Sequence, residues 1–313
     1  MGIAYFTGGT VLVSVCIYLF YRTLREIYRV VLIPPRKGLR KTPADFGMDY
    51  HEFQTLTRDR KKIVGWLINS PCPSRGTLIL CHNMGGSKEK MLPYARFLHR
   101  AGYRTVLFDF RSHGSSDKSY AIFHALQRRT RDIESVWQYI TGQTDTAQGY
   151  GIMGFSLGTV NSILFANACP NIKTIILDSG PPLFTDKDYQ SFFKRGVRLP
   201  YYPYYPIFKL MFRLMTGFDY TSMIKREIGK LSPKALLMIH GLRDSIFSSK
   251  DTMSLYRDCA FVPKMYWSVP NAFHMTAHFS NRKAYENRVL DFLKAHLELD
   301  SQEQFSLIRE QNG

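Results

Sequence analysis

The chain has few cysteines and no repeated or low-complexity segments. Its 313 residues include five cysteines, an odd number, and none of them form a C-x-x-C pair. Most lie in apolar surroundings, so we interpret them as reduced, buried side chains rather than as a disulfide framework. Such usage favours a reducing compartment such as the cytosol. The five positions are Cys16, Cys72, Cys81, Cys169 and Cys259.

Acidic residues are also scarce. The 25 aspartates and glutamates face 42 lysines and arginines, which gives a formal net charge of +17. A charge of this size can indicate nucleic-acid binding, but no nucleic-acid-binding motif is present, so we expect no such partner. A basic surface held at an anionic membrane leaflet explains the charge more simply.

Charge is missing altogether from residues 1–21. A helix needs about 20 apolar residues to cross a bilayer, so this stretch predicts a transmembrane anchor. A cleaved signal peptide is disfavoured, because a basic start, a shorter apolar run and a small-residue cleavage site are not evident. The alternative is a buried helix of a soluble domain.

Residues 22–49 form a basic segment, in which seven lysines and arginines and the single acid Glu26 precede Thr42. Apolar residues recur there at helical spacing as far as Ile33, and Pro34 and Pro35 then end the helix. By the positive-inside rule this flank stays cytoplasmic, so we predict a single-pass membrane protein with its main domain in the cytosol. An extracytoplasmic domain is the alternative.

The pentapeptide Gly154-Phe155-Ser156-Leu157-Gly158 joins a strand-like run to a helix-compatible stretch. In a sharp strand-to-helix turn, the two glycines leave room for neighbouring backbone while the serine hydroxyl is exposed. Ser156 is therefore the candidate nucleophile. The helix that follows points free amides at the site, so the Leu157 N–H is a candidate oxyanion donor.

A serine nucleophile needs a base and an acid, and both types follow strand-like runs downstream. The run 235–239 leads to Asp244, and the run 264–269 leads to His274, so we assign these residues as acid and base. Asp178, after the run 175–177, is the alternative acid, and His278 is the alternative base. No acidic residue lies between the two histidines as in H-E-x-x-H, so we predict neither a metal site nor a cofactor.

These elements together resemble the α/β-hydrolase superfamily over residues 50–297. The order Ser156, Asp244, His274 is that of the family. The segment 82–86 is similar to the loop that supplies a second oxyanion amide there, which implies the amide of Met84 or, alternatively, of Asn83. The segment 109–115 is similar to the family's D-x-R-x-H-G-x-S element, in which we expect Asp109 and Arg111 to be a buried pair that fixes the loop.

The resemblance implies an α/β fold with a mostly parallel central sheet, helices on both faces and a helical cap. We divide the chain into an anchor (1–21), a basic juxtamembrane helix and linker (22–49), a first core half (50–180), a cap or lid (181–230), a second core half (231–297) and a polar tail (298–313). The cap is rich in aromatic residues and proline. It either lines an acyl-binding pocket and touches the membrane or packs its aromatics inward as an ordinary helical subdomain.

The sequence therefore predicts a membrane-anchored serine hydrolase of the carboxylesterase or lipase type. Its substrate would be an ester or thioester of a lipid or another acyl compound, and membrane lipids would contact its N-terminal helix. The resemblance extends to single-anchor hydrolases and to S9-type peptidases, so a serine peptidase is one alternative. A catalytically silent binding protein is the other.

Overall fold

The computed structural model describes residues 2–36, 38–143, 149–231, 234–259 and 263–298. The strands are β1 (Tyr50–Leu56), β2 (Lys62–Ile68), β3 (Thr77–Cys81), β4 (Arg104–Phe108), β5 (Tyr150–Phe155), β6 (Ile172–Asp178), β7 (Ala235–Gly241) and β8 (Lys264–Val269). The helices are α1 (Gly2–Ile27), α2 (Leu92–Arg100), α3 (Ala125–Arg128), α4 (Thr130–Thr141), α5 (Gly158–Ala168), α6 (Asp186–Gly196), α7 (Tyr201–Thr216), α8 (Tyr220–Gly229), α9 (Ser249–Asp258), α10 (Ala277–Ser280) and α11 (Arg282–His296). A π-helical turn covers Tyr28–Leu32, and 3-10 turns cover Pro43–Phe46 and Lys88–Met91.

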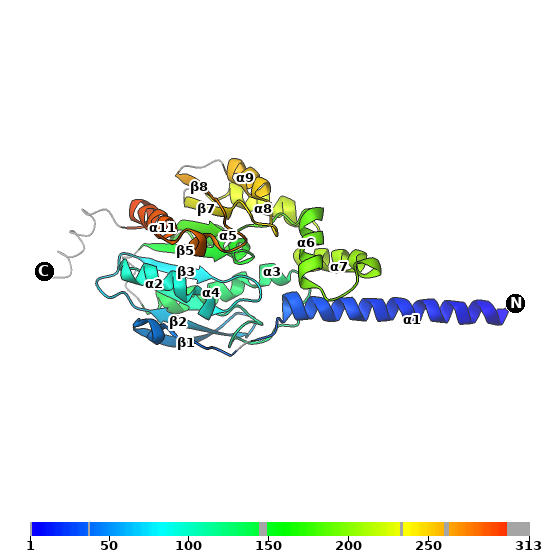
Figure 1. The fold of residues 1–313 in the computed structure, drawn as a ribbon. Helices are drawn as coiled ribbons and strands as arrows, with labels where there is room; N and C mark the ends of the chain where they lie inside the picture. Colours follow the sequence, from blue (N-terminus) through cyan, green and yellow to red (C-terminus); the bar gives the residue numbers. More distant parts are fainter. Residues whose placement is uncertain (1, 37, 144–148, 232–233, 260–262, 299–313) are drawn as a thin grey trace.

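The eight strands form one twisted sheet in the order β1-β2-β4-β3-β5-β6-β7-β8 (Figure 1). The pairs β1–β2 and β2–β4 are antiparallel, and every later pair is parallel. Central strands such as β5 and β7 are buried along their whole length, which explains their continuous apolar sequence. The carboxyl ends of β3 to β8 consequently meet at one edge, where the loops carry the candidate site residues.

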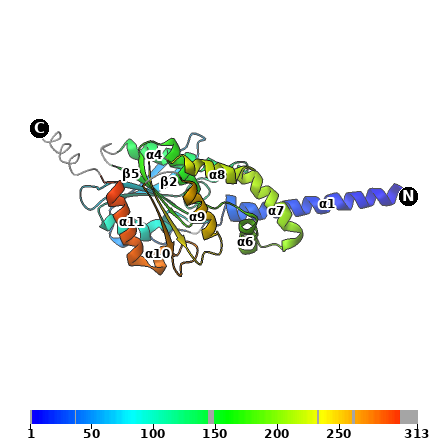
Figure 2. The same ribbon diagram turned by 90° about the horizontal axis from the view of Figure 1, so that it is seen from above.

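Helices cover both faces of the sheet (Figure 2). On one face, α4 and α5 bury residues such as Ile133 and Val160, and α8 and α9 pack beside them. On the other face, α2 and α11 bury Tyr94 and Val289. This three-layer arrangement confirms the predicted α/β fold with a mostly parallel sheet.

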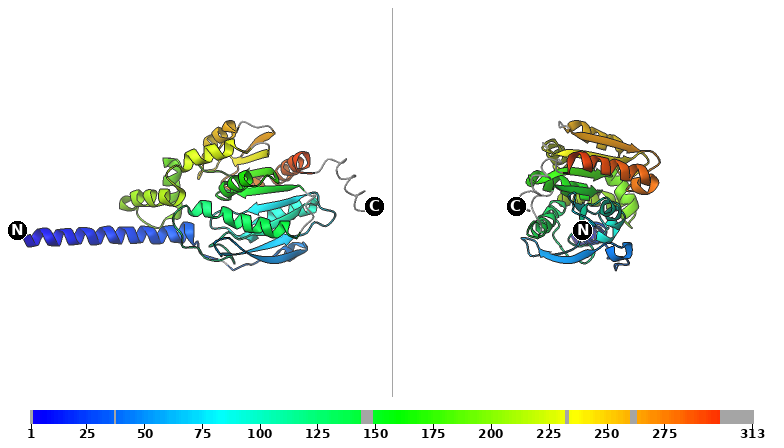
Figure 3. Two further views of the ribbon diagram at one scale, coloured as in Figure 1. Left: turned by 180° about the vertical axis from the view of Figure 1, so that it is seen from behind. Right: turned by 90° about the vertical axis from the view of Figure 1, so that its left-hand side faces the viewer.

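The helices α6, α7 and α8 lie between β6 and β7 in the chain; α6 and α7 project from the end of the sheet (Figure 3), whereas α8 packs against α5 and α9. Most of their aromatic residues pack inward, as Phe184, Phe193 and Phe212 are nearly fully buried. Phe192 differs, because it also lines the cavity described below. The cap is therefore a small subdomain with its own aromatic core and one face turned to the site.

The long helix α1 extends away from the domain, and its last turns pack against α7 (Figures 1 and 3). Residues such as Val11, Leu12 and Ile17 are more than half exposed, whereas Thr23 and Ile27 are buried. Among the described residues, no helix is long and apolar enough to cross a membrane. The transmembrane helix predicted over residues 1–21 is therefore not supported: the described apolar stretch runs directly into a charged end that packs on the domain.

Most other elements lie where the sequence pattern puts them. The stretch after Ser156 forms α5, and the two strand-like runs downstream form β7 and β8. The 3-10 turn Lys88–Met91 leads directly into α2. Of the predicted polar tail, only Glu298 belongs to the described residues.

Candidate active site

Ser156 sits in the turn between β5 and α5 with a φ of 52°, in the left-handed region that non-glycine residues rarely occupy. A Cβ on Gly154 would lie 2.7 Å from the Cα of Thr159, and one on Gly158 would lie 2.7 Å from the carbonyl oxygen of His82. Both contacts are too short for a real side chain. The two glycines thus allow the close strand-to-helix approach that holds Ser156 at the sheet edge.

Three side chains from separate loops form a hydrogen-bonded chain. The Ser156 Oγ lies 2.9 Å from the Nε2 of His274, and the Nδ1 of His274 lies 2.7 Å from the Oδ2 of Asp244. A carboxylate can only accept, so Nδ1 carries the proton and Nε2 is free to accept from the serine hydroxyl. The structure thus brings together all three residues that the sequence singled out, in the order an acyl-transfer site requires.

The environment of Asp244 favours its charged form. Burial raises the pKa of this carboxyl, but the hydrogen bond from His274 and the amides of Phe247 and Ile246 outweigh burial, so its pKa is below the usual range. Its Oδ1 accepts both amides, at 2.9 Å from Ile246 and 3.1 Å from Phe247. An ionised, immobile carboxylate therefore faces the imidazole and stabilises it when it gains a proton.

The second predicted oxyanion donor lies in the loop after β3. Among the described residues, the amides of Met84 and Leu157 have no hydrogen-bond partner, and both residues line the same cavity as Ser156. Asn83 also lines this cavity; its carbonyl accepts from the Nδ1 of His82 at 2.7 Å, and its side-chain amide donates to the Met84 carbonyl at 3.1 Å. Met84 and the alternative Asn83 therefore both lie at the cavity, and the choice of Met84 as the second oxyanion donor stays a prediction.

Two buried histidines hold this loop in place. His82 accepts from the Phe110 amide at 3.0 Å through its Nε2, and His113 accepts from the Gly85 amide at 3.1 Å. Burial lowers the pKa of His82 to about 4 and lowers that of His113 as well, so both rings are neutral acceptors at pH 7. Their roles are positional, because each ring accepts a backbone amide that fixes a loop.

The alternative acid and base have other partners. Asp178 accepts from the Tyr285 hydroxyl at 2.7 Å and from the Ser179 hydroxyl at 2.8 Å, and burial raises its pKa to about 6. His278 is buried beside aromatic rings, and its Nε2 lies 3.0 Å from Glu286. Neither group has a hydrogen bond to the Ser156–His274 pair.

Asp109 and Arg111 are buried and fix loops, but they do not pair with each other as the sequence suggested. Asp109 accepts from the fully buried Lys88 ammonium at 2.7 Å. Arg111 instead binds Asp59 and Asp132, each at 2.7 Å. The prediction of a pair was wrong because both side chains find partners from distant segments on opposite sides of the loop.

A cavity of about 280 Å³ opens beside the Ser156–His274 pair. Its walls are mainly apolar and come mostly from the loop after β3, the elbow, the cap helix α6 and the loop after Asp244. The lining residues include Met84, Leu157, Phe192, Arg195, Ile246 and Phe247. Because the apolar walls are several residues wide, they fit an acyl group placed against the serine.

One wall of this cavity was not foreseen from the sequence. Val30, in the π-helical turn after α1, lines the cavity and lies against Gly196 of α6. π-helical turns interrupt the regular helical ladder and occur often at functional sites. The apolar residues at helical spacing beyond residue 22 indicate a helix that packs on another surface. The local sequence does not show which surface of the domain this helix covers.

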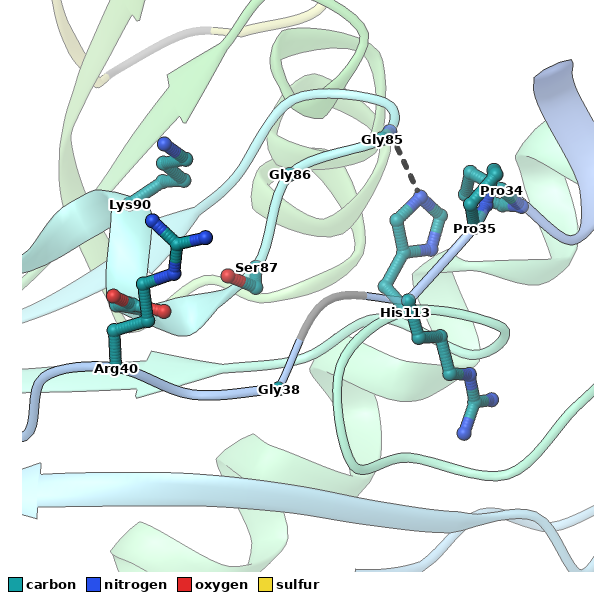
Figure 4. A pocket seen from close by; sticks show the side chains of 11 residues that line it. Pro34, Pro35, Gly38, Arg40, Gly85, Gly86, Ser87, Lys90 and His113 are labelled. Atoms are coloured by element: carbon teal, nitrogen blue, oxygen red, sulfur yellow. Dashed lines mark hydrogen bonds between the residues drawn. The ribbon is translucent and has the colours of Figure 1, made fainter.

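A second cavity of about 190 Å³ lies on the other side of the loop after β3. It is lined by Pro34, Arg40, Lys90 and the loop residues Gly85–Ser87, and the bond from Gly85 to His113 closes one end of it (Figure 4). It includes neither Ser156 nor His274, so the reaction chemistry belongs to the first cavity.

Comparison with known proteins agrees with this fold. The family model described as serine aminopeptidase, S33, matches residues 72–209, a stretch that contains Met84 and Ser156 but ends before Asp244 and His274. The uncharacterized protein YqkD of Bacillus subtilis is 24% identical over 225 residues, covering 72% of this chain and 73% of its own. The uncharacterized protein YfhR of Salmonella typhi is 25% identical over 305 residues, covering 91% and 93%.

Among solved structures, the Pyrococcus furiosus esterase Pf2001 superimposes with a TM-score of 0.72 at 25% identity, over 85% of this chain and 97% of that one. A membrane phospholipase A, described as a bacterial virulence factor, superimposes with a TM-score of 0.59 at 16% identity, over 93% and 98%. The second likeness is one of fold alone.

Proposed function

We propose that this chain is a serine hydrolase of the α/β-hydrolase superfamily that cleaves a carboxylic ester or thioester of a lipid or another acyl compound, a proposal that the matched family model and the likeness to esterase Pf2001 support. The observation that carries this proposal is the hydrogen-bonded order Ser156, His274, Asp244 beside a mainly apolar cavity. A catalytically silent binding protein would not need the strained elbow and the aligned imidazole together.

In the proposed reaction, the Ser156 oxygen attacks the acyl carbonyl carbon while the Nε2 of His274 takes the hydroxyl proton. The amides of Leu157 and Met84 stabilise the negative charge on the carbonyl oxygen. His274 then gives the proton to the leaving alcohol or thiol, and the acyl group stays on Ser156. Water attacks this acyl-enzyme with His274 again as base, which releases the acid and restores the serine.

The test compares wild type with Ser156→Ala, using a tagged fluorophosphonate and p-nitrophenyl esters of increasing chain length. We expect the wild type to be labelled and to hydrolyse the esters, and the variant to lose both while unfolding at the same temperature. Labelling that persists in a folded Ser156→Ala variant would exclude this serine as the nucleophile.

A peptidase is the second candidate, because the matched family model is that of a serine aminopeptidase. An aminopeptidase must bind the positive amino terminus of its substrate, and an aspartate or glutamate best supplies that contact. The described lining of the cavity contains neither. We therefore expect aminoacyl p-nitroanilides to be much poorer substrates than p-nitrophenyl esters, and the reverse order would favour the peptidase.

We also propose that α1 associates with a membrane surface and that the hydrolase domain faces the cytosol. In support, Val11, Leu12 and Ile17 are each more than half exposed, and Arg22 and Arg25 follow them. Flotation with anionic vesicles should be lost in a Leu12→Glu/Ile17→Glu variant. Binding that is unchanged in this variant contradicts a role for α1.

The side of the membrane can be tested with the natural cysteines. Cys72 is exposed on the hydrolase domain. In a Cys16→Ser background, a membrane-impermeant maleimide should label Cys72 only after cells are opened. Labelling in intact cells would place the domain outside.

A further inference from the structure

The lining of the active-site cavity contains one permanently charged side chain, Arg195 in the last turn of α6. It has no ion pair or hydrogen bond with any residue that the structure describes. No aspartate or glutamate occurs in the described lining, and Asp244 is occupied by His274. The cavity thus combines apolar walls with one unneutralised cation.

The backbone around Arg195 is held from both sides by the end of α1. Arg29 donates to the Gly196 carbonyl at 2.9 Å, and the Arg198 amide donates to Glu26 at 3.2 Å. Glu26 and Arg29 also bind each other at 2.6 Å, so the charge of Arg29 is neutralised locally. Two partly buried hydrogen bonds therefore hold the backbone at the end of α6, and the exposed Arg195 side chain remains an unpaired charge at the cavity.

We infer that Arg195 determines specificity by binding an anionic group of the substrate, so that the preferred substrate is an amphiphilic ester with an apolar acyl chain and a phosphate, sulfonate or carboxylate. This inference rests on the proposed function and names the substrate class of the same site. A guanidinium offers paired donors that match the oxygens of such groups. The anionic group can belong to a lipid headgroup or to a soluble ester, and the chemistry of recognition is the same.

A structural role for Arg195 gives a different expectation. A cation in the last turn of a helix also interacts favourably with the helix dipole. That interaction changes the free energy of unfolding, and its loss would lower kcat/KM for charged and neutral substrates alike. The decisive measurement is consequently the dependence on substrate charge at constant acyl length.

The experiment uses the full chain and two octanoate esters that differ only in charge, 4-carboxyphenyl octanoate and its neutral isostere 4-carbamoylphenyl octanoate. We expect Arg195→Gln to lower kcat/KM for the anionic ester about five- to tenfold at low ionic strength, and for the neutral ester less than about twofold. Arg195→Lys should restore part of the difference. The control is Lys194→Gln, since Lys194 lies over the Tyr201 ring outside the cavity and should not change the ratio.

Equal losses on both esters, or no loss on either, would overturn the inference while leaving the hydrolase proposal intact. If the wild type turns over neither ester, the proposed function fails, and calorimetry on the Ser156→Ala variant then decides the inference. Octyl sulfate should bind this variant more tightly than octanol, and adding Arg195→Gln should remove the preference. Absence of any preference would overturn the inference independently of activity.

Competition identifies the source of the anionic group. Vesicles of phosphatidylglycerol, compared with vesicles of phosphatidylcholine, are added to the assay of the neutral ester. Inhibition by the anionic vesicles that depends on Arg195 but not on Lys194 supports the inference with a lipid headgroup as ligand. Selectivity for the soluble anionic ester without vesicle inhibition supports it with a soluble substrate.

Discussion

Exchange of Asp244 for asparagine is expected to lower kcat while leaving the fold intact. The Oδ1 of Asp244 accepts the amides of Ile246 and Phe247, at 2.9 and 3.1 Å, and its Oδ2 faces the Nδ1 of His274. An asparagine that keeps its oxygen on the two amides must turn its NH₂ group toward Nδ1. The imidazole then carries its proton on Nε2, and a protonated Nε2 can no longer accept the hydroxyl proton of Ser156.

The size of this effect follows from the loss of the correct tautomer and of the charge that stabilises the imidazolium, and in a Ser-His-Asp site these losses together cost roughly 10³- to 10⁴-fold in kcat. The assay measures kcat on a p-nitrophenyl ester, the rate of fluorophosphonate labelling and the urea midpoint. The matched control is Asp178→Asn, a second buried carboxylate that follows a strand and binds Tyr285 instead. We expect Asp178→Asn to change kcat less than about tenfold.

Two results would refute this reasoning. If Asp244→Asn keeps kcat within about tenfold of wild type, the hydrogen bond to His274 does not determine the tautomer. If Asp178→Asn has the larger effect, the acid of the site is Asp178, the residue at the end of β6. A collapse of the urea midpoint in Asp244→Asn would show instead that the two amides, not the imidazole, depend on the carboxylate.

Two further predictions concern the elbow and the loop beside it. Gly158→Ala should lower the fluorophosphonate labelling rate about a hundredfold, because the new methyl group would lie 2.7 Å from the backbone carbonyl oxygen of His82 and must displace the nucleophile; labelling at the wild-type rate would contradict this. His82 has a pKa of about 4 when folded because it is buried, so below about pH 6.5 the unfolded chain takes up a proton that the folded chain does not. Its contribution to stability is complete above that pH and is lost as the pH falls toward 4, so the free energy of unfolding of wild type relative to His82→Gln should drop by about 2 kcal/mol between pH 7 and pH 5. A difference that stays constant with pH in urea titrations would show that His82 is protonated in the folded state.

The residues nearest the chemistry could be predicted because their geometry is local. The short contacts at the turn require Gly154 and Gly158, and both lie within the five-residue motif that contains Ser156. Asp244 and His274 could be placed because each follows an apolar strand, and the carboxyl ends of parallel strands meet at one edge. The long sequence separation between Ser156, Asp244 and His274 did not prevent this prediction, because it depended only on recognising the strands.

The N-terminal segment could not be predicted in the same way. An uncharged run followed by arginines has the same pattern whether it crosses a bilayer, lies on its surface or packs on its own domain. Here the end of α1 packs on the cap, Arg29 reaches the Gly196 carbonyl, and Val30 becomes part of the cavity wall. These contacts join residues more than 160 positions apart, and no local pattern indicates them.

The lack of a local signal for long-range contacts also explains why the partners of the two buried charges after β4, Asp109 and Arg111, were not predicted. The D-x-R-x-H-G-x-S element specifies that an aspartate and an arginine stand two residues apart, but both lie past the end of β4, where the alternation of a strand no longer sets the direction of a side chain. Asp109 meets Lys88 from the loop before α2, and Arg111 meets Asp132 of α4. Because a buried ion is tolerated only with a partner, each side chain requires a cation or a carboxylate from its own side of the sheet. The element therefore fixes the loop that carries His113 by joining it to both faces of the domain. Through the hydrogen bond from Gly85 to His113, it also holds the loop that carries Met84 at the edge where the reaction is proposed to occur.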